Sequence, residues 1–385
     1  MKVLTPSAID AVSRPFPIQA PSPRMEVVEI TTEDELDSLR SDWNQLASQL
    51  EVPSPFHSWE WNRLWWKHFG VGHRLHILVF RRAGQAMGIA QLYERGLGFG
   101  RIKLPALVPI GWEGYGRGKG ITEQLEFLFP SDARDDLFRA LGGWLETRPW
   151  TALIVSGLHE QGALPSWFVA HQAVAREPVE YPYRELPQTW DEFVKTLNKS
   201  MRDNVKYYPK LMVRKGHPFE FEVASTPEAI PDGLSVFFDL HRARAESQMR
   251  VHHGNRFRYP RRRAFVREVA PLLAAHDELK IGILRVRGEA VASQMWLEKG
   301  DTMFMNYSGY LPEWAEYSVG MICAAEAFKY GIARGIKRVE FLQGSGQFKR
   351  RWDTQNRVYR TILFTPMPGA TRIMLRIREA IGRFT

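Results

Sequence analysis

The same succession of predicted elements occurs twice along this chain of 385 residues. Residues 32–93 are patterned as two helices followed by a β-hairpin, and residues 233–297 repeat that order. The two hairpin turns are similar in sequence, since residues 84–88 read GQAMG and residues 288–292 read GEAVA. Hairpins reuse glycine turns by chance, but the matching order on both sides favours a duplication. A repeat of this length predicts paired domains rather than a solenoid, and superposition of the two units should bring the two turns together.

Composition and charge patterns divide the chain into five segments. We expect residues 1–25 to be a disordered leader, and residues 26–185 and 219–366 to be two folded domains. A basic helical segment at residues 186–218 should lie where the domains meet, and residues 367–385 form a basic amphipathic tail that suits peripheral membrane contact. Each domain should hold its own central mixed sheet, so the fold class is α+β.

Capping and turn signals support these elements. Two capping boxes, at residues 32–35 and 189–192, open predicted helices. Apolar residues follow the second box at a spacing of four, until Pro209 should end or kink that helix. Residues 278–310 are patterned as a three-stranded meander, and a helix closed by Gly335 precedes two further strands.

The charge and cysteine content bound the possible partners. A formal net charge of +9 and a pI near 9.6 suit an anionic partner, which could be a phosphorylated cofactor, an RNA or a membrane surface. The single cysteine, Cys323, excludes a disulfide framework and a multi-cysteine metal site, and its apolar helical setting predicts buried packing. No apolar run reaches the ~18 residues that a membrane span needs, so a cytoplasmic protein with at most peripheral membrane contact is expected.

Five segments of the sequence, in this order, resemble the GNAT acyltransferases, and within them the CelD/BcsL-like branch that is related to the Fem-type peptidyltransferases. They are PFHSWEWNRLWWKHFG, LNKSMRDNVKYYPKL, DLHRARAESQ, YSGYLPEWAEYSVGMICAAEAFKYGI and VEFLQGSGQFKRRW. The resemblance implies two tandem GNAT-like domains with a cleft between or beside them. It also implies transfer of an acyl group from coenzyme A, or of an aminoacyl group from tRNA as in the Fem relatives.

The start of the predicted helix at 318–335 is the expected donor site. Ser318, Val319 and Gly320 stand where GNAT proteins carry a phosphate loop of the form [QR]-x-x-G-x-[GA], and only one glycine is present here. Free N–H groups and the positive end of the helix dipole can still hold a pyrophosphate, with Ser318 as N-cap. The alternative is an ordinary helix cap.

Candidate catalytic residues lie on elements that border the cleft in the resembling fold. His241, in the helix FFDLHRARAE, has an ordinary pKa near 6.5 that suits a general base, although most lone helical histidines are only half-exposed surface residues. Tyr307 and Gln294 are the other catalytic candidates, and Tyr310 is assigned to substrate binding. A tyrosine can protonate a leaving thiolate and a glutamine can orient a carbonyl, but plain sheet packing is the alternative for each. We expect one of these three to face the substrate.

Two basic segments are candidates for binding an anionic group. Lys349, Arg350 and Trp352 follow a Gly-rich turn after a strand, a setting in which adjacent cations can wrap a phosphate or carboxylate. Lys199 and Arg202 lie on one helical stripe that could hold an anionic donor or a lipid head group. A solvated surface is the alternative for both segments, and residues 261–263, three arginines around a helix, are interpreted as surface.

The sequence therefore predicts an N- or O-acyltransferase in which an amine or hydroxyl attacks a thioester directly. Acyl-CoA is the expected co-substrate, the acceptor is an envelope-related lipid base, saccharide or peptide, and neither a metal nor specific DNA binding is expected. Two alternatives remain open. One is a Fem-like transferase that uses aminoacyl-tRNA, and the other is a non-catalytic binding module of a polysaccharide-synthesis complex.

Overall fold

The structure of the chain is a computed structural model that describes residues 24–99, 102–113, 120–148, 150–159, 174–175, 178–247, 254–344 and 346–365. The predicted leader, except for its last two residues, and the predicted amphipathic tail lie outside these residues. No helix in the described part is long and apolar enough to cross a membrane.

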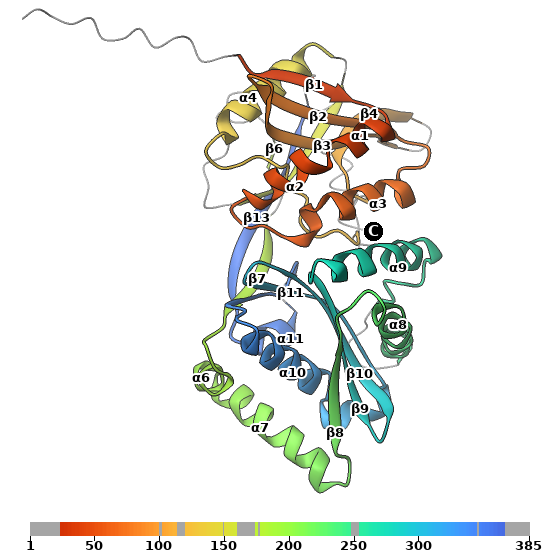
Figure 1. The fold of residues 1–385 in the computed structure, drawn as a ribbon, viewed down its shortest axis with the longest axis vertical. Coiled ribbons are helices and arrows are strands. Elements are labelled where there is room, and N and C mark those ends of the chain that lie inside the picture. The colour runs from red at the N-terminus through yellow and green to blue at the C-terminus, as the bar shows by residue number, and fades with distance from the viewer. Residues whose placement is uncertain are drawn as a thin grey trace, which may run out of the picture.

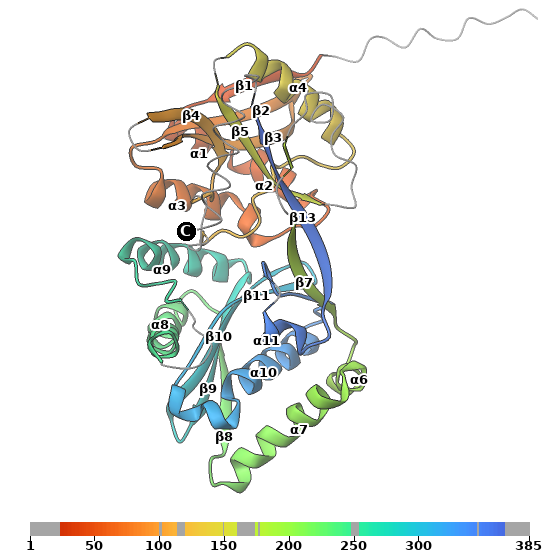
Figure 2. The same ribbon diagram turned by 180° about the vertical axis from the view of Figure 1, so that it is seen from behind.

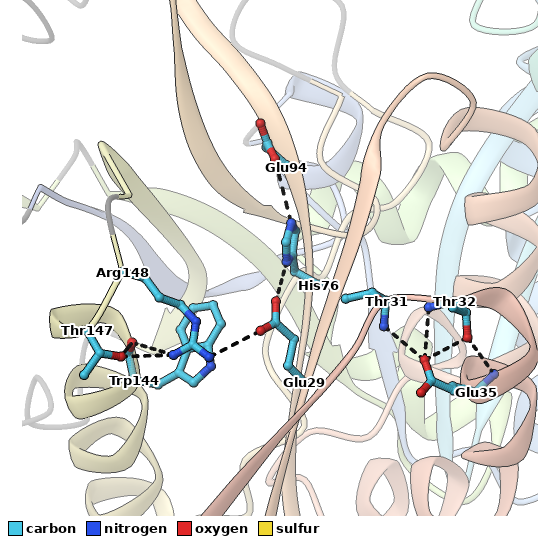
Figure 3. A network of polar contacts seen from close by, with 9 residues as sticks. All are labelled: Glu29, Thr31, Thr32, Glu35, His76, Glu94, Trp144, Thr147 and Arg148. Atoms are coloured by element: carbon cyan, nitrogen blue, oxygen red, sulfur yellow. Dashed lines mark hydrogen bonds and ion pairs between the residues drawn. The ribbon is translucent and has the colours of Figure 1, made fainter.

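In its described residues, the first half of the chain carries three α-helices before a β-meander and one after it. In order, the elements are β1 (Glu26–Ile30), α1 (Glu33–Ser38), α2 (Arg40–Ser48), η1 (Pro55–His57), α3 (Trp59–Phe69), β2 (Arg74–Arg82), β3 (Gln85–Phe99), β4 (Ile102–Pro109), α4 (Arg134–Glu146), β5 (Ala152–His159), β6 (Val174–Ala175) and β7 (Val179–Glu185). The predicted capping box at the start of α1 is confirmed: Glu35 N–H donates to Thr32 Oγ1 and Thr32 N–H donates to Glu35 Oε2 (Figure 3).

The second half repeats this order after two linking helices. Its elements are α6 (Trp190–Thr196), α7 (Lys199–Arg214), β8 (Phe219–Ala224), α8 (Ile230–Glu246), α9 (Pro260–Ala275), β9 (Leu279–Val286), β10 (Glu289–Lys299), β11 (Thr302–Tyr310), η2 (Pro312–Tyr317), α10 (Val319–Ala333), β12 (Arg338–Glu340), α11 (Gln347–Arg350) and β13 (Gln355–Phe364). Both halves run strand, helices, three-stranded meander, helix, strand, and in both the strand after that helix (β5 or β12) lies parallel to the third strand of the meander.

The two predicted hairpin turns share their backbone conformation as well as a similar amino-acid sequence. Ala83 and Gly84 have φ of 51° and 82°, and Arg287 and Gly288 have φ of 51° and 83°. Two successive residues with positive φ make the tight turn that suits the twist of a hairpin. In both turns an arginine two residues before the turn closes it, since Arg81 Nη1 donates to Gly84 O at 2.9 Å and Arg285 Nη1 donates to Gly288 O at 3.1 Å. This agreement supports the duplication.

The strands form one sheet, which corrects the expectation of two separate sheets. Thirteen strands follow the order β1-β2-β3-β4-β5-β13-β7-β12-β11-β10-β9-β8, with β6 on β13. The halves are joined because they exchange strands: β7, from the first half, pairs with β12, while β13, at the end of the second half, pairs with both β5 and β7. Figures 1 and 2 show β7 and β13 crossing between the two lobes.

Packing joins the halves a second time. The indole of Trp61 in α3 meets the ring of Phe265 in α9 edge-on at 5.1 Å, and one apolar core extends through both halves. In the second half, α8 and α9 cover one face of the sheet and α10 covers the other, with α7 outside α10 (Figure 1). Cys323 of α10 is 1% exposed, so the prediction that it packs in the interior is confirmed.

One predicted helix boundary is wrong. The segment after Thr189 was expected to be a single helix that ends or kinks at Pro209, but the helix breaks earlier, at Leu197, and α7 then continues through Pro209 to Arg214. Asn198 opens α7 by accepting a hydrogen bond from Met201 N–H at 2.9 Å. The buried side chains of Met201, Val205 and Met212 fix α7 on the core, which offsets the hydrogen bond that the proline removes.

Candidate functional site

The last six residues of β11 have a free edge. Strand β12 pairs with β11 only over Thr302–Phe304, and from Met305 onwards no other strand of the described chain lies on that side of β11. A β-bulge falls within this stretch, since Trp296 of β10 pairs with Met305 and Met295 pairs with Tyr307, which leaves Asn306 without a cross-strand partner. Such bulges re-aim backbone groups and are frequent next to active sites. The buried Asn306 Oδ1 also has no hydrogen-bond partner among the described residues.

The start of α10 lies directly against the end of this edge. A Cβ atom added at Gly320 would come within 3.2 Å of Cδ1 of Tyr310, the last residue of β11. Ser318 stands at the N-cap position but adopts a left-handed conformation, with φ 53°, and its side chain caps nothing, which corrects the predicted capping role. Met321 and Ile322 N–H both donate to Ser318 O, so the N–H groups of Val319 and Gly320 are those that point beyond the helix.

His241 does not offer a free lone pair. Its Nδ1 lies 2.9 Å from Ser308 O, and its Nε2 accepts a hydrogen bond from Arg256 N–H at 3.3 Å. Burial, and then the charges of Arg244 and Arg256, lower the pKa of His241 to about 4, although the Ser308 carbonyl opposes them. A neutral imidazole with both nitrogens engaged braces the free edge of β11, and this geometry argues against the predicted general-base role.

Gln294 and Tyr307 also hold the distorted strand. The amide of Gln294, whose side chain is buried, donates to Met295 O at 2.9 Å and Tyr307 O at 3.0 Å, on both sides of the bulge. The ring of Tyr307 packs on Phe257 at 5.0 Å, and burial raises the pKa of its hydroxyl. The environment of both side chains suits packing and bracing better than proton transfer, so the predicted catalytic roles of these two residues lose support.

Tyr310 lies at the end of the free edge, and its assignment to substrate binding stays a prediction. Its half-buried ring lies between the bulge and the start of α10, with the guanidinium carbon of Arg244 5.1 Å from the ring centre. Arg244 Nη1 donates to Ser308 Oγ at 2.7 Å. Burial lowers the pKa of Arg244, while the charge and hydrogen bond of Tyr310 act in the opposite direction. The free edge, the bulge at Asn306, Tyr310, Arg244 and the N–H groups at 319–320 therefore form one continuous site, here called the β11 site.

The corresponding opening in the first half is filled by its own chain. Strand β4 pairs with β5 at only two residues, and the loop that follows β4 returns over the gap. Leu128 of this loop exchanges backbone hydrogen bonds with Ile89 of β3, and Glu126 packs on Gly157 of β5, which has φ 79°. In the described residues, the strand edge of the second half is therefore free, whereas the loop after β4 covers the corresponding edge of the first half.

The same returning loop reaches the second half. Glu123 Oε2 accepts a hydrogen bond from Gln343 N–H at 2.9 Å, just after β12. Glu113 pairs with Arg262 at 2.7 Å, and Arg262 is 8% exposed, so the interpretation of this arginine as a surface residue is wrong. The first half thus borders the β11 site without filling it.

The predicted basic loop has a different role from the one expected. Lys349 Nζ donates to Leu342 O at 2.9 Å and Gln343 O at 2.8 Å, which braces the turn after β12, where Leu342 has φ 60°. Trp352 is 0% exposed and packs edge-on against Phe328 at 4.8 Å, so its predicted contact with substrate is wrong. Arg350 remains an exposed cation on α11.

Lys199 and Arg202 lie near this loop but not at the β11 site. They are in the first turn of α7, which is tied to the end of α11 because Asn198 Nδ2 donates to Arg351 O and to Asp353 Oδ1. The β11 site instead meets the other end of α7, where the ring of His217 packs against Trp314 and Tyr317 of η2. The structure therefore separates Lys199 and Arg202 from the β11 site.

Apart from the β11 site, a polar cavity of about 220 Å³ lies where β13 crosses between the halves. It is lined by Glu51, Val52, Glu126, Arg134, Arg338, Arg357 and Tyr359. Burial raises the pKa of Glu126 to about 7, against the opposing charge of Arg134. Burial also raises the pKa of the neighbouring Glu340 to about 7, although Arg357 Nη1 lies 2.6 Å from Glu340 Oε1. These charges largely compensate one another, which suits a structural network at the strand crossing.

Metal ligands do not gather anywhere in the described residues: no group of three or more His, Cys, Asp and Glu side chains is placed to hold an ion. Sequence reasoning missed Asn306, Arg244 and Glu123. Arg244 stands one helical turn after His241 and could have been found from that spacing, whereas a bulge and a contact between the halves leave no local pattern.

Comparison with known proteins agrees with this geometry. Residues 199–350 match the family described as Acetyltransferase (GNAT) domain, so the second half carries a GNAT domain. The crystal structure of FemX is similar with a TM-score of 0.58 and 11% identity, over 87% of this chain and 96% of that one. No curated protein matches in sequence.

Two further solved structures share the architecture. The C-terminal DUF2156 domain of an Agrobacterium fabrum protein named as a lysylphosphatidylglycerol synthetase gives a TM-score of 0.52 at 9% identity, over 91% of this chain and 97% of that one. The structure of L-PGS from Bacillus licheniformis gives 0.50 at 9% identity, over 89% and 96%. At such identities the likeness shows the fold, which is the tandem arrangement expected from the sequence.

Proposed function

We propose that the protein is an acyltransferase that moves an acyl group from a thioester donor to an amine or hydroxyl at the β11 site. The observation that carries this proposal is the free, bulged edge of β11 beside the start of α10, in the half that matches the GNAT domain. The filled opening of the first half supports one reaction centre, with the first half shaping the cleft.

The backbone of β11 suits an extended donor that contains amide groups. A peptide-like arm can add to a free strand edge through main-chain hydrogen bonds, as peptides do when they extend a sheet. The donor arm would lie along Met305–Tyr310, and its phosphate end would meet the N–H groups of Val319 and Gly320, where the helix dipole favours negative charge.

The transfer itself needs few groups. The acceptor nitrogen or oxygen attacks the carbonyl carbon and loses its proton to solvent. The C–S bond then breaks, and the thiolate leaves as the free thiol after taking up one proton. A backbone N–H at the bulge of Asn306 can stabilise the oxyanion that forms on the carbonyl oxygen. The hydroxyl of Tyr310, the last residue of this edge, is the proposed proton donor, and the Arg244 guanidinium lies against its ring.

Acyl-CoA and an aminoacyl donor are the two candidate donors of the acyl group. Acyl-CoA is favoured by the match to the acetyltransferase family. Three observations favour an aminoacyl donor such as aminoacyl-tRNA. The start of α10 has a single glycine, at 320, and the exposed carboxylates of Glu313 and Glu316 just before it oppose the binding of a pyrophosphate there. A solved structure with the same fold is named for lysylphosphatidylglycerol. An envelope-related amine or hydroxyl is the proposed acceptor in both cases, at a cytoplasmic or peripheral membrane location.

Release of free thiol from acyl-CoA, in the presence and absence of cell-envelope extract, tests this proposal. We expect release that depends on the acceptor, and Tyr310→Phe should lower kcat by roughly 10²-fold with little change in KM, because a proton donor contributes in the chemical step. Tyr183→Phe on β7 is the matched control, since its hydroxyl contacts Gln355 away from the β11 site.

The outcomes separate the two donors. Transfer from charged tRNA without any use of acyl-CoA would replace the donor while keeping the site. If neither donor is consumed and the envelope extract is bound tightly, the protein is a binding module. Full activity of Tyr310→Phe would remove the proton-donor role.

A further inference from the structure

Helix α7 presents an unusually basic face that the proposed reaction does not use. From Lys199 to its C-cap, α7 carries the cations Lys199, Arg202, Lys206, Lys210, Arg214 and Lys215 and a single acidic residue, Asp203. None of these cations forms an ion pair with another residue in the described ranges, whereas on the strands of the second half Arg285 pairs with Glu222 and Arg338 pairs with Glu185. Such a charged surface calls for an external anionic partner.

The cations form a stripe because of the helical repeat. Lys199, Lys206 and Lys210 are all exposed and, at seven and eleven residues from the first, lie on one line along the helix. Met201, Val205 and Met212 are buried on the opposite side, against the core. Figures 1 and 2 both show α7 along the outer edge of the second half. The stripe therefore faces outwards along the length of a 16-residue helix.

Apolar side chains flank this stripe. Tyr207 is 51% exposed and Val213 is 59% exposed, two of the most exposed large apolar side chains of the described chain. An aliphatic side chain gains nothing from a nucleic-acid backbone, but it is stabilised at the boundary between lipid headgroups and acyl chains, where tyrosine is also favoured. Lysines with apolar neighbours on one outward helical face are the pattern of a helix that lies flat on a bilayer.

We infer that the outer face of α7 docks the protein on an anionic lipid bilayer. The Lys199, Lys206 and Lys210 ammonium groups lie at the level of the headgroup phosphates, while Tyr207 and Val213 reach the boundary of the acyl chains. This inference does not depend on which donor the β11 site uses, and it gives Lys199 and Arg202 a role in membrane contact instead of substrate binding.

Sedimentation of the full chain with vesicles tests the docking surface. We expect binding to vesicles of phosphatidylcholine mixed with phosphatidylglycerol and little binding to phosphatidylcholine alone. The triple variant Lys199→Gln/Lys206→Gln/Lys210→Gln should partition roughly 100-fold less onto the anionic vesicles, since each cation near such a surface contributes about 1 kcal/mol. Tyr207→Ser/Val213→Ser should weaken binding that persists at about 1 M salt, where charge is screened within about 3 Å.

The control removes the same charge elsewhere. Arg74→Gln/Arg139→Gln/Lys337→Gln changes three exposed cations on other elements and should bind as the wild type does. Equal binding by the two triple variants would overturn the inference. So would an α7 variant that loses affinity for total tRNA in a filter assay while vesicle binding stays unchanged, because the stripe would then be a nucleic-acid surface.

Discussion

At the scale of single residues, two buried histidines act as neutral hydrogen-bonding groups. His241 braces Ser308 O and is 7% exposed, and His57, the last residue of η1, is 1% exposed. Burial lowers the pKa of His57 to about 3, with a smaller contribution from Lys299, and burial lowers the pKa of His241 to about 4. In the unfolded chain each would take up a proton near pH 6.5, so both stabilise the fold above that pH and lose this contribution as the pH falls.

The histidine environment predicts a pH dependence of stability. Between about pH 7.5 and about pH 5, His241→Asn should lose about 2 kcal/mol less unfolding free energy than the wild type, at 1.36 kcal/mol per pH unit below the unfolded pKa. Urea denaturation at both pH values measures this difference. His276→Asn, at an exposed position, is the control and should follow the wild type. An unchanged slope, together with a kcat that collapses in His241→Asn, would restore this histidine as the base.

Residue chemistry was only partly readable from the sequence. The type and position of Tyr310, Gly320 and Cys323 were sufficient to predict where they lie. For His241 the sequence shows an ordinary helical histidine, because the groups that engage its nitrogens, Ser308 O and Arg256 N–H, belong to segments distant along the chain. The prediction that Trp352 contacts substrate was wrong for the same reason, since the core residues that it packs against lie more than twenty residues away along the chain.

At the scale of elements, α8 and β11 touch backbone to backbone. A Cβ atom at Gly309 would lie 2.3 Å from the backbone nitrogen of His241 and 2.4 Å from the carbonyl carbon of Leu240. Only glycine permits this approach, which brings His241 and Arg244 to Ser308. The free edge of the β11 site thus depends on how closely one helix can pack on one strand.

This contact predicts the effect of adding a single methyl group. Gly309→Ala should destabilise the fold by about 1–3 kcal/mol, because the atoms that it meets are backbone atoms that cannot rotate away. The variant should also lower acyl transfer, since α8 must move from β11. Thermal denaturation gives the first effect and thiol release the second. Gly143→Ala in α4, where an added Cβ meets nothing within 4 Å, should instead stabilise by up to about 1 kcal/mol.

Elements with strong local signals were predictable. The capping box at Thr32, the turns at Gly84 and Gly288 and the helix before Gly335 all appear in the structure. The prediction of a helix end at Pro209 was wrong because the tertiary packing of α7 outweighs the one hydrogen bond that the proline removes. The bulge at Asn306 left no signal, because a bulged strand alternates apolar and polar residues much as a regular strand does.

At the scale of the whole molecule, the duplication and the strand exchange act together. Local patterns indicate that β7 and β13 are strands, but they do not encode which sheet edge each one joins, so two separate sheets were the natural expectation. In the structure neither half forms a complete sheet from its own residues. Strand β13, from the second half, completes the sheet of the first half, and β7, from the first half, completes that of the second.

The exchange predicts that the halves cannot fold alone. Residues 24–185 and 186–365 expressed as separate chains should each lack a cooperative thermal transition by circular dichroism, because each carries a strand that belongs to the other and lacks one of its own. Co-expression should give a one-to-one complex by size-exclusion chromatography. A sigmoidal transition in either fragment alone would contradict the prediction, and the intact chain should unfold in a single step.

The position of β13 also governs how the protein emerges from the ribosome. The first half is synthesised with the edge of β5 unpaired, and its partner strand, Gln355–Phe364, is made only after β8 to β12 and the helices between them. An unpaired strand edge is a template for wrong pairing with other chains. Unlike most two-domain proteins, whose first domain folds while the second is still being made, this chain must wait for β13, which follows the second half, before its first half is complete. Its nascent form is therefore a natural client for chaperones that bind unpaired strands.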